Sequence, residues 1–408
     1  MEEQNKAKLE VVVTLKSKID YIFGDELNHK INPKSEAIFN DKAVEALDLL
    51  AKAILKDSES KLFPDVITFG FFIRKANINK FRKRYIDDKN RFGRGLVFHI
   101  APSNVALNFA YSMTASLLAG NSNVIRLASK DFPQTTLLIK LIKQCAKSNS
   151  YLKEKLCFIK YDRDDEVNEY FSEMADARVV WGGDTTVAYF RKYQTKPRCV
   201  DVMFANRNSL LVIDSRYILT LSAKDLNGYV EKFIQDALFF EQNACTSPKL
   251  VYWYGTNEQN KLAKEKFWSE SLNFDLANLN IRGKETTDKL MRVIDLALTE
   301  KIGYRKYGLI DTVELNQVDD VELMTANRFG LFYELEGDNL LGLGSVLDDR
   351  TQTISYIAAH ADQFFNELIE SGFNQFDRIV PIGKSSDFDF LWDGYDLINT
   401  LSRKISVI

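Results

Sequence analysis

The sequence predicts an α/β protein, with a doubly wound parallel sheet followed by a second α/β domain. From residue 95 onward, short apolar segments alternate with longer segments of helical periodicity. Connections of that length join parallel strands, whereas antiparallel strands need only a short turn. The chain has 408 residues, 45% of them hydrophobic, which is enough to build two separate cores.

Two amphipathic helices, near 4–22 and 39–56, are expected to cover the first sheet. The strands of that sheet are expected at 96–100, 123–127, 156–159, 178–181 and 210–213. The helices between them are expected near 105–119, 131–148, 164–175 and 185–193. The second domain is expected to hold a strand at 249–254 and helices near 223–240, 257–270, 284–300 and 354–371.

Domain boundaries follow from this order of elements, because neither an internal repeat nor a low-complexity linker marks them. We expect the first domain to span 1–215 and the second to span 216–370. The C-terminal segment 371–408 is expected to return to the first domain or to form an oligomer contact.

Composition excludes several classes of function. The formal charge is −3 and the isoelectric point is about 5.9, and no basic stripe alternates with aromatic residues, so nucleic acid is not an expected partner. The N-terminus is acidic and polar, and no apolar run is long enough to cross a bilayer, so we expect a cytoplasmic protein. The four cysteines lack CxxC spacing and there are three histidines, which argues against a metal site or a disulfide framework.

Ligands of open parallel sheets bind at the carboxyl ends of the strands. The first predicted strand is followed by Pro102, Ser103 and Asn104. The Asn104 amide could donate a hydrogen bond to an oxyanion. Alternatively, Ser103 or Asn104 caps the next helix. The sequence leaves both possibilities open.

Two further strand ends carry candidate binding residues. Arg126, Ser129 and Lys130 follow the second strand and offer donors for a phosphate, although such a cluster can equally be solvated surface. Gly182 and Gly183 follow the fourth strand and open a helix, which would allow a pyrophosphate to approach closely. The GxGxxG pattern is absent, and a Gly-Gly pair also serves as an ordinary turn.

Cys245 is the candidate nucleophile. It falls between the helix expected at 223–240 and the strand expected at 249–254, so it lies on a short turn between two buried elements. The thiolate is the form of cysteine that attacks a carbonyl, and a turn can lower the pKa of a thiol through main-chain N–H groups or nearby cations. The alternative is a small apolar side chain packed under the strand.

Taken together, these motifs resemble the aldehyde dehydrogenase superfamily in order and spacing. More specifically, four segments resemble the fatty acyl-CoA reductases of bacterial bioluminescence: Ser129 to Gln134, Ala244 to Pro248, Asp377 to Lys384, and Trp392 to Gly394. The resemblance extends from about residue 90 to the end of the chain. It implies an aldehyde dehydrogenase-like fold with a dinucleotide-binding first domain and a catalytic second domain. It also implies NADPH-dependent reduction of an activated acyl group to an aldehyde through an acyl-cysteine.

The resemblance implies roles for individual residues. Cys245 corresponds to the nucleophile, and Asn104 with the main-chain N–H of Cys245 corresponds to the oxyanion hole. The cofactor-binding residues that it implies are Pro102, Ser103, Arg126, Ser129, Lys130, Gly182 and Gly183. NAD-preferring members often carry a glutamate where this chain has Ser129, followed here by Lys130. The exchange removes a negative charge and supplies donors for a ribose phosphate, which favours NADPH over NADH.

Two departures from the superfamily bear on the chemistry. Oxidising members carry a glutamate that activates water to hydrolyse the thioester, and the corresponding stretch from Phe204 to Ser209 contains no carboxylate. This fits a reductase that keeps its thioester until hydride transfer. The Glu-X-Phe-Gly-Pro stretch that holds the nicotinamide ribose in oxidising relatives is also missing. The candidates for the proton donor are Glu241, His99 and His360, which the sequence does not rank.

Two alternatives to a reductase remain open. Cys245 could accept and pass on acyl groups without a hydride step, or the fold could be a scaffold with an unreactive cysteine. The expected partner is an acyl donor, either acyl-CoA or an acyl-protein, and an acyl-protein synthetase could replace coenzyme A as the source. A homo-oligomer is also expected. The sequence does not set the length of the acyl chain.

Overall fold

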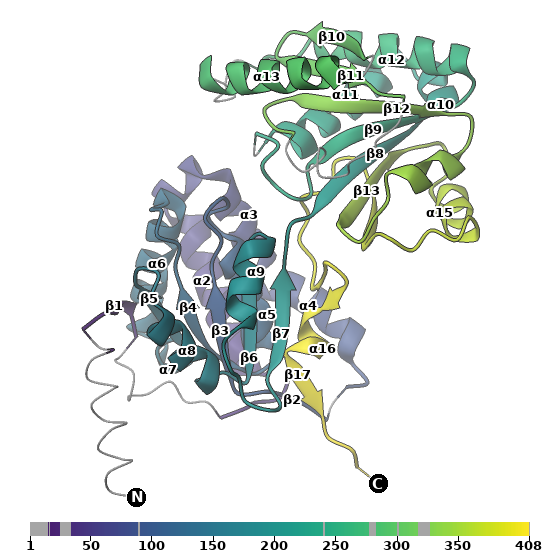
Figure 1. Ribbon diagram of the computed structural model, residues 1–408. Coiled ribbons are helices and arrows are strands. Elements are labelled where there is room, and N and C mark those ends of the chain that lie inside the picture. Colours follow the sequence, from purple (N-terminus) through teal and green to yellow (C-terminus); the bar gives the residue numbers. More distant parts are fainter. Residues whose placement is uncertain are drawn as a thin grey trace, which may run out of the picture. The chain divides into compact units, whose positions relative to one another are not determined.

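Figure 1 shows the computed structural model of the chain. The structure describes residues 15, 17–24, 34–88, 90–239, 241–276, 283–299, 302–316 and 327–407. The chain divides into two compact units. Unit 1 comprises Met1–Ala205 together with Asp389–Ile408, and unit 2 comprises Asn206–Phe388.

Within the described residues, unit 1 is built on a six-stranded sheet with the order β1-β5-β4-β3-β6-β7. The edge strand β1 is antiparallel to β5, and the other neighbours are parallel. The strands are β1 (Asp20–Phe23), β3 (Leu96–Ile100), β4 (Ser122–Arg126), β5 (Leu156–Lys160), β6 (Ala177–Trp181) and β7 (Val200–Phe204). The switch point of this doubly wound sheet lies between β3 and β6, where the chain reverses its order across the sheet.

Helices connect the strands of this sheet. They are α5 (Asn108–Leu118), α6 (Pro133–Ala146), α7 (Ser150–Lys155), α8 (Asp165–Met174) and α9 (Asp184–Arg191). One core cluster joins Ile159 of β5 with Phe171 of α8 and Phe190 of α9. The neighbouring residue Phe158 instead contacts Phe109 of α5, with ring centroids 6.0 Å apart. Because successive strand residues point to opposite faces, α5 and the α8/α9 pair lie on opposite faces of the sheet.

Between β1 and β3 along the chain lie the helices α2 (Asp41–Lys56), α3 (Pro64–Phe72) and α4 (Lys75–Arg82). The side chain of Asn40 caps α2 by accepting a hydrogen bond from the Ala43 N–H at 2.9 Å. At the end of the chain, α16 (Leu397–Thr400) leads into β17 (Ser402–Lys404), which pairs antiparallel with β2 (Arg91–Gly93). The last twenty residues therefore belong to unit 1.

Unit 2 holds a seven-stranded sheet, counted over the residues that the structure describes, with the order β10-β11-β12-β9-β8-β13-β14. All neighbours are parallel except β10 and β11. The strands are β8 (Asn208–Asp214), β9 (Pro248–Tyr254), β10 (Gly303–Tyr307), β11 (Ile310–Glu314), β12 (Leu331–Gly337), β13 (Thr351–Ile357) and β14 (Arg378–Pro381).

Alternate residues of the central strands of unit 2 enter two different cores. Leu211 and Trp253 pack with α10 (Ser215–Thr220), α11 (Ala223–Leu238) and α12 (Asn257–Ser271). Leu210 and Tyr252 pack on the other face, against residues of α13 (Gly283–Thr299) and α15 (Ala361–Glu370). Burial on both faces explains why these strands are apolar runs rather than alternating patterns.

Several elements differ from those that the sequence predicts. The strand expected at 210–213 is present as β8, but it lies between β9 and β13 in the second sheet. Strand β7 closes the first sheet in its place. The helix expected at 354–371 begins only at Ala361, because the preceding β-branched residues form β13 inside the sheet. Of the helix expected at 4–22, residues 4–14 and 16 lie outside the described residues, and its last residues belong to strand β1.

Candidate active site

Cys245 lies on the turn between α11 and β9 in unit 2, where it is partly exposed. Two residues of this turn, Glu241 (φ 54°) and Gln242 (φ 64°), have left-handed backbone conformations, which residues other than glycine rarely adopt. The Ser209 hydroxyl donates to the Cys245 carbonyl at 2.7 Å, and the Ser247 N–H donates to the Ala244 carbonyl at 3.1 Å. A turn with such a backbone persists only where the surrounding structure holds it in place.

The buried side chain of Gln242 holds that turn. Its amide nitrogen donates to the carbonyl of Pro248 and to the carbonyl of Leu331, both at 3.0 Å. Its amide oxygen accepts from the Gly330 N–H at 2.9 Å. The side chain therefore ties the cysteine turn to the starts of two parallel strands, β9 and β12. Sequence reasoning did not single out Gln242, because two of its three partners, Gly330 and Leu331, lie almost ninety residues away in the sequence.

Gln352 contacts the candidate nucleophile directly. Its side-chain nitrogen lies 3.3 Å from the Cys245 sulfur and donates to it. Gln352 is fully buried, and it lies at an irregularity in β13, where Thr351 pairs with Asn208 but Thr353 pairs with Ser209. Such a bulge re-aims a side chain that regular pairing would direct elsewhere.

Lys249 places a buried amino group on the same turn. Its side chain is buried among the first residues of β9, at a second irregularity, where Ser209 pairs with Pro248 and Leu210 pairs with Leu250. Burial, together with the nearby Arg328, lowers the pKa of Lys249 to about 7, although Cys245 acts in the opposite direction. The amino group donates to the main-chain carbonyls of Gln242 and Asn327.

The segment that leads into β12 also lies against the cysteine turn. The Phe329 N–H donates to the carbonyl of Glu241 at 3.1 Å, and Phe329 is itself left-handed, with φ 61°. Asn327, Arg328, Phe329 and Gly330 form this segment.

The other three cysteines are less suited to nucleophilic chemistry. Cys145 and Cys157 are buried in the core of unit 1. Burial raises the pKa of the Cys145 thiol. Burial, together with the nearby Asp201, raises the pKa of Cys199 to about 11. A raised pKa keeps a thiol protonated and therefore unreactive at neutral pH.

The loop after β3 in unit 1 carries Pro102, Ser103 and Asn104. Pro102 is buried, whereas Ser103 and Asn104 are exposed. The following helix α5 begins only at Asn108, and its N-cap residue is Leu107. Neither Ser103 nor Asn104 therefore caps this helix, which removes the structural alternative that the sequence left open for them. The Asn104 amide is exposed on this loop.

Arg126 ends β4 on the face that α8 and α9 cover. Its register partner on β5 is Ile159, which belongs to the core beneath those helices. The guanidinium carbon lies 4.6 Å from the centroid of the Tyr161 ring, and Nη2 donates to the Tyr161 carbonyl at 3.4 Å. Gly183 is the N-cap residue of α9, so the glycine pair and Arg126 both belong to this face.

Gly182 is required at its position by close packing. A Cβ atom on Gly182 would lie 2.7 Å from the side chain of Thr186 in α9. The main chain at the end of β6 therefore runs directly against the first turn of the helix. Gly182 and Gly183 are both partly exposed at this strand end, where a pyrophosphate site would require close approach of the main chain.

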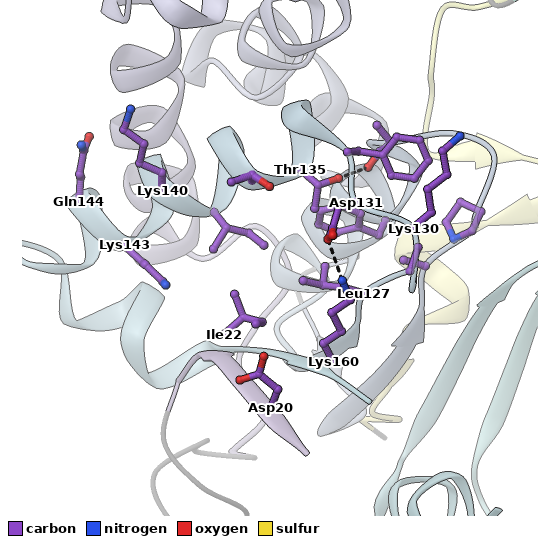
Figure 2. Close-up of a pocket in the computed structure, with 18 of the residues that line it drawn as sticks. Asp20, Ile22, Leu127, Lys130, Asp131, Thr135, Lys140, Lys143, Gln144 and Lys160 are labelled. Carbon is purple, nitrogen blue, oxygen red and sulfur yellow. Dashed lines mark hydrogen bonds and ion pairs between the residues drawn. The ribbon is translucent and has the colours of Figure 1, made fainter. Parts of the chain in front are cut away.

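Lys130 and Pro102 line a cavity of about 740 Å³ beside α6 (Figure 2). Leu127 and Ile139 contribute apolar lining, and further lysines line the cavity: Lys140, Lys143, Lys147 and Lys160. Ser129 is exposed. Arg126 is not among the residues that line this cavity.

The burial of His99 argues against a role as an exchangeable proton donor. This side chain is fully buried in β3, with its ring nitrogens 3.2 Å from the Ser112 hydroxyl and 2.9 Å from the Asn123 amide oxygen. Burial lowers the pKa of His99 to about 4, so the ring is neutral at physiological pH. His360 is exposed at the start of α15, and Glu241 lies on the cysteine turn itself.

In the described part of the chain, no group of three or more histidine, cysteine, aspartate or glutamate side chains is arranged to hold a metal ion. Among the helices that the structure describes, none has both the length and the apolar character needed to cross a bilayer.

Curated relatives share part of this sequence. The long-chain acyl-protein thioester reductase of Aliivibrio fischeri is 26% identical over 166 residues, which is 40% of this chain and 33% of the relative. The protein of the same name from Photorhabdus luminescens is 26% identical over 175 residues, or 42% of this chain and 35% of the relative. The matched region thus covers about a third of the length of these relatives.

Solved structures show the same fold. A NAD-dependent benzaldehyde dehydrogenase from Corynebacterium glutamicum superposes with a TM-score of 0.60 at 13% identity, over 88% of this chain and 84% of that one. The Delta-pyrroline-5-carboxylate dehydrogenase from Mycobacterium tuberculosis gives a TM-score of 0.60 at 13% identity, over 90% and 78%. The fold is aldehyde dehydrogenase-like, as the sequence predicts. The pattern of the family described as "Acyl-CoA reductase (LuxC)" matches residues 41–277, more than half of the chain, and the protein therefore belongs to the LuxC acyl-CoA reductase family.

Proposed function

We propose that the protein reduces an acyl thioester to an aldehyde with NADPH, through an acyl group carried on Cys245. The observation that carries this proposal is the setting of Cys245. It combines a turn held in a disfavoured backbone conformation with an amide donor 3.3 Å from the sulfur. Membership of the acyl-CoA reductase family supports the same chemistry.

In the proposed first step, the Cys245 thiolate attacks the carbonyl carbon of the donor thioester. A C–S bond to Cys245 forms, and the bond to the donor sulfur breaks, so the donor leaves as a thiol once it gains a proton. The resemblance assigns Asn104 to stabilise the negative charge that develops on the carbonyl oxygen. Gln242 contributes by holding the turn, and therefore the sulfur, in one position.

When bound, NADPH supplies the hydride that converts the acyl group to the aldehyde. The face of unit 1 that carries Arg126 and the glycine pair suits such a group, because Arg126 offers guanidinium donors and the partly exposed Gly182 and Gly183 carry no side chain at the start of α9. Pro102 and Ser103, on the loop after β3, lie at a carboxyl strand end of the same sheet. Ser129 places no negative charge there, which supports NADPH over NADH.

The carboxylate that activates water in oxidising relatives has no counterpart in the corresponding stretch of this chain, and its loss favours reduction over hydrolysis. The stretch from Phe204 to Ser209 holds no carboxylate, and its Arg207 forms an ion pair with Asp377 at 3.4 Å. Without a carboxylate to take its proton, water attacks the acyl carbon slowly. The acyl-enzyme then persists until hydride arrives.

The proposed partner is an acyl donor, either acyl-CoA or an acyl-protein. The relatives named above are acyl-protein thioester reductases, which makes an acyl-protein, and a synthetase that forms it, a candidate source. An assembly of several copies of this chain also remains a proposal.

The test is intact mass spectrometry of the protein after incubation with acyl-CoA of several chain lengths, without nicotinamide. We expect the addition of one acyl mass that hydroxylamine removes, and Cys245→Ala should abolish it. Adding NADPH should release the aldehyde. Labelling that maps to Cys145, Cys157 or Cys199 would contradict the proposal, and acylation without aldehyde release would point to a transferase.

A further inference from the structure

The side chain of Gln352 lies in direct contact with the candidate nucleophile. Its amide nitrogen donates to the Cys245 sulfur at 3.3 Å, across 107 residues of sequence. The side chain is fully buried, and the main-chain carbonyl accepts from the Asp377 N–H at 3.1 Å. The bulge in β13 fixes the backbone of Gln352, and burial confines its side chain. The fold of unit 2 therefore holds this contact in place.

We infer that Gln352 is a catalytic residue with two effects on Cys245. Its amide stabilises the thiolate before acylation. After acylation, the amide does not accept a proton from water, as a carboxylate at this position would, so it does not promote hydrolysis of the acyl-cysteine. This inference rests on the proposed function, because it concerns the same cysteine and the same acyl-enzyme. The chemical character of an amide supports both effects. An amide N–H donates to a negative charge, and the amide oxygen does not take up a proton at physiological pH.

The first effect follows from the charge of the thiolate. A hydrogen bond to a charged acceptor stabilises the charged form and shifts the ionisation equilibrium toward it. The charged groups near this contact come from several segments. Lys249 lies on β9, and Arg328 precedes β12. On the main-chain side of Gln352, Asp377 forms an ion pair with Arg207, so these two charges largely offset one another.

The second effect follows from what hydrolysis requires. Water oxygen forms a bond to the acyl carbon, the C–S bond to Cys245 breaks, and the proton lost by water must pass to a base. A carboxylate at the position of Gln352 could take that proton, whereas an amide does not. With an amide beside the sulfur, hydrolysis is therefore slower than with a carboxylate there, and the acyl-cysteine lasts until hydride transfer.

The experiment compares the unsubstituted protein with Gln352→Glu, Gln352→Met and the control Gln375→Glu. Gln375 is exposed on the segment before β14, so its substitution makes the same charge change away from the sulfur. Gln352→Met keeps the length and removes both polar groups. Thermal unfolding of each variant establishes that it is folded, and Gln352→Met preserves the test of the first effect where a buried carboxylate prevents folding.

The first measurement is the pH dependence of Cys245 alkylation by iodoacetamide, followed by mass. One charged hydrogen bond corresponds to about a tenfold change in an ionisation constant, so both Gln352 variants should raise the alkylation midpoint by about one pH unit. Gln375→Glu should leave it unchanged. Midpoints that stay at the value of the unsubstituted protein in both Gln352 variants would overturn the first effect.

The second measurement is the lifetime of the isolated acyl-enzyme without nicotinamide. Gln352→Glu should lose its acyl group to water about 10²-fold faster, the lower end of the range for general-base catalysis. Gln352→Met should keep the original lifetime. An unchanged lifetime in Gln352→Glu would overturn the second effect. If the unsubstituted protein takes up no acyl group, the proposed function fails, while the alkylation measurement still decides the role of Gln352 toward the thiol.

Discussion

The amino group of Lys249 donates to the main-chain carbonyl of Gln242, the second of the two left-handed residues that precede Cys245. A lysine at the start of β9 thus stabilises the turn that carries the cysteine. The same amino group reaches the carbonyl of Asn327, so it also joins the turn to the segment before β12. Because burial lowers the pKa of this amino group, the free energy of unfolding is expected to depend on pH.

We expect the stability of the protein to depend on Lys249 above neutral pH. Burial lowers its folded-state pKa to about 7, whereas in an unfolded chain a lysine titrates at about 10.4. Between these values the unfolded state binds more protons, so the free energy of unfolding rises with pH through this window. Lys249→Met should reduce that rise.

Urea denaturation at pH 7, 8, 9 and 10 would measure the effect of Lys249. The control is Lys261→Met, at an exposed position of α12, which should keep the slope of the unsubstituted protein. Stability curves of the unsubstituted protein and Lys249→Met that run parallel would show that Lys249 stays charged in the folded state.

His99 should make the protein less stable in acid. Burial lowers its folded-state pKa to about 4, below the unfolded value of about 6.5, so the unfolded state gains a proton first as the pH falls. Stability present above pH 6.5 should be lost as the pH falls toward 4, by at most about 3 kcal/mol. His99→Gln should lessen this loss. The matched control is the exposed His360→Gln, and equal acid sensitivity of the two variants would contradict the prediction.

Asn104→Ala should slow acylation by about 10²–10³-fold, as expected for loss of one donor to a developing oxyanion. Because the N-cap residue of α5 is Leu107 rather than Asn104, the melting temperature should stay the same. The rate of acyl transfer to Cys245, measured by mass at short times, tests this. A lower melting temperature with an unchanged rate would assign Asn104 a structural role instead.

NADPH should bind at least about tenfold more tightly than NADH, since a charge-assisted hydrogen bond to the 2′-phosphate contributes on the order of 1.5–3 kcal/mol. Ser129→Glu should invert this preference through like-charge repulsion. Titration of both proteins with both cofactors at fixed salt measures it. Equal affinities of the unsubstituted protein for the two cofactors would show that Ser129 does not face the ribose phosphate.

The same titration separates Arg126 from Lys130. Arg126 lies on the face that α8 and α9 cover, whereas Lys130 lines the cavity beside α6. Arg126→Met should therefore weaken NADPH binding more than Lys130→Met does. A larger effect of Lys130→Met would place the ribose phosphate at the cavity of Figure 2 instead.

The sequence by itself determined most of the local structure of this protein. Strand β3 occupies the five residues expected at 96–100, and helices α11 and α12 begin at the expected residues 223 and 257. These elements follow from the spacing of apolar residues and from polar residues at their ends, such as the capping box of Thr256 and Gln259. The turn position of Cys245 follows in the same way, since it lies between two elements that the sequence predicts.

Only the tertiary structure decided how distant segments combine. Sheet membership of β8 depends on its pairing with β9 and β13, which no local pattern encodes. The contact between Gln352 and Cys245 and the three hydrogen bonds of Gln242 arise because strands remote in sequence pair in register and bulge at their ends. Residue periodicity fixes which face of an element is buried, but neighbouring strands fix which side chain meets the sulfur.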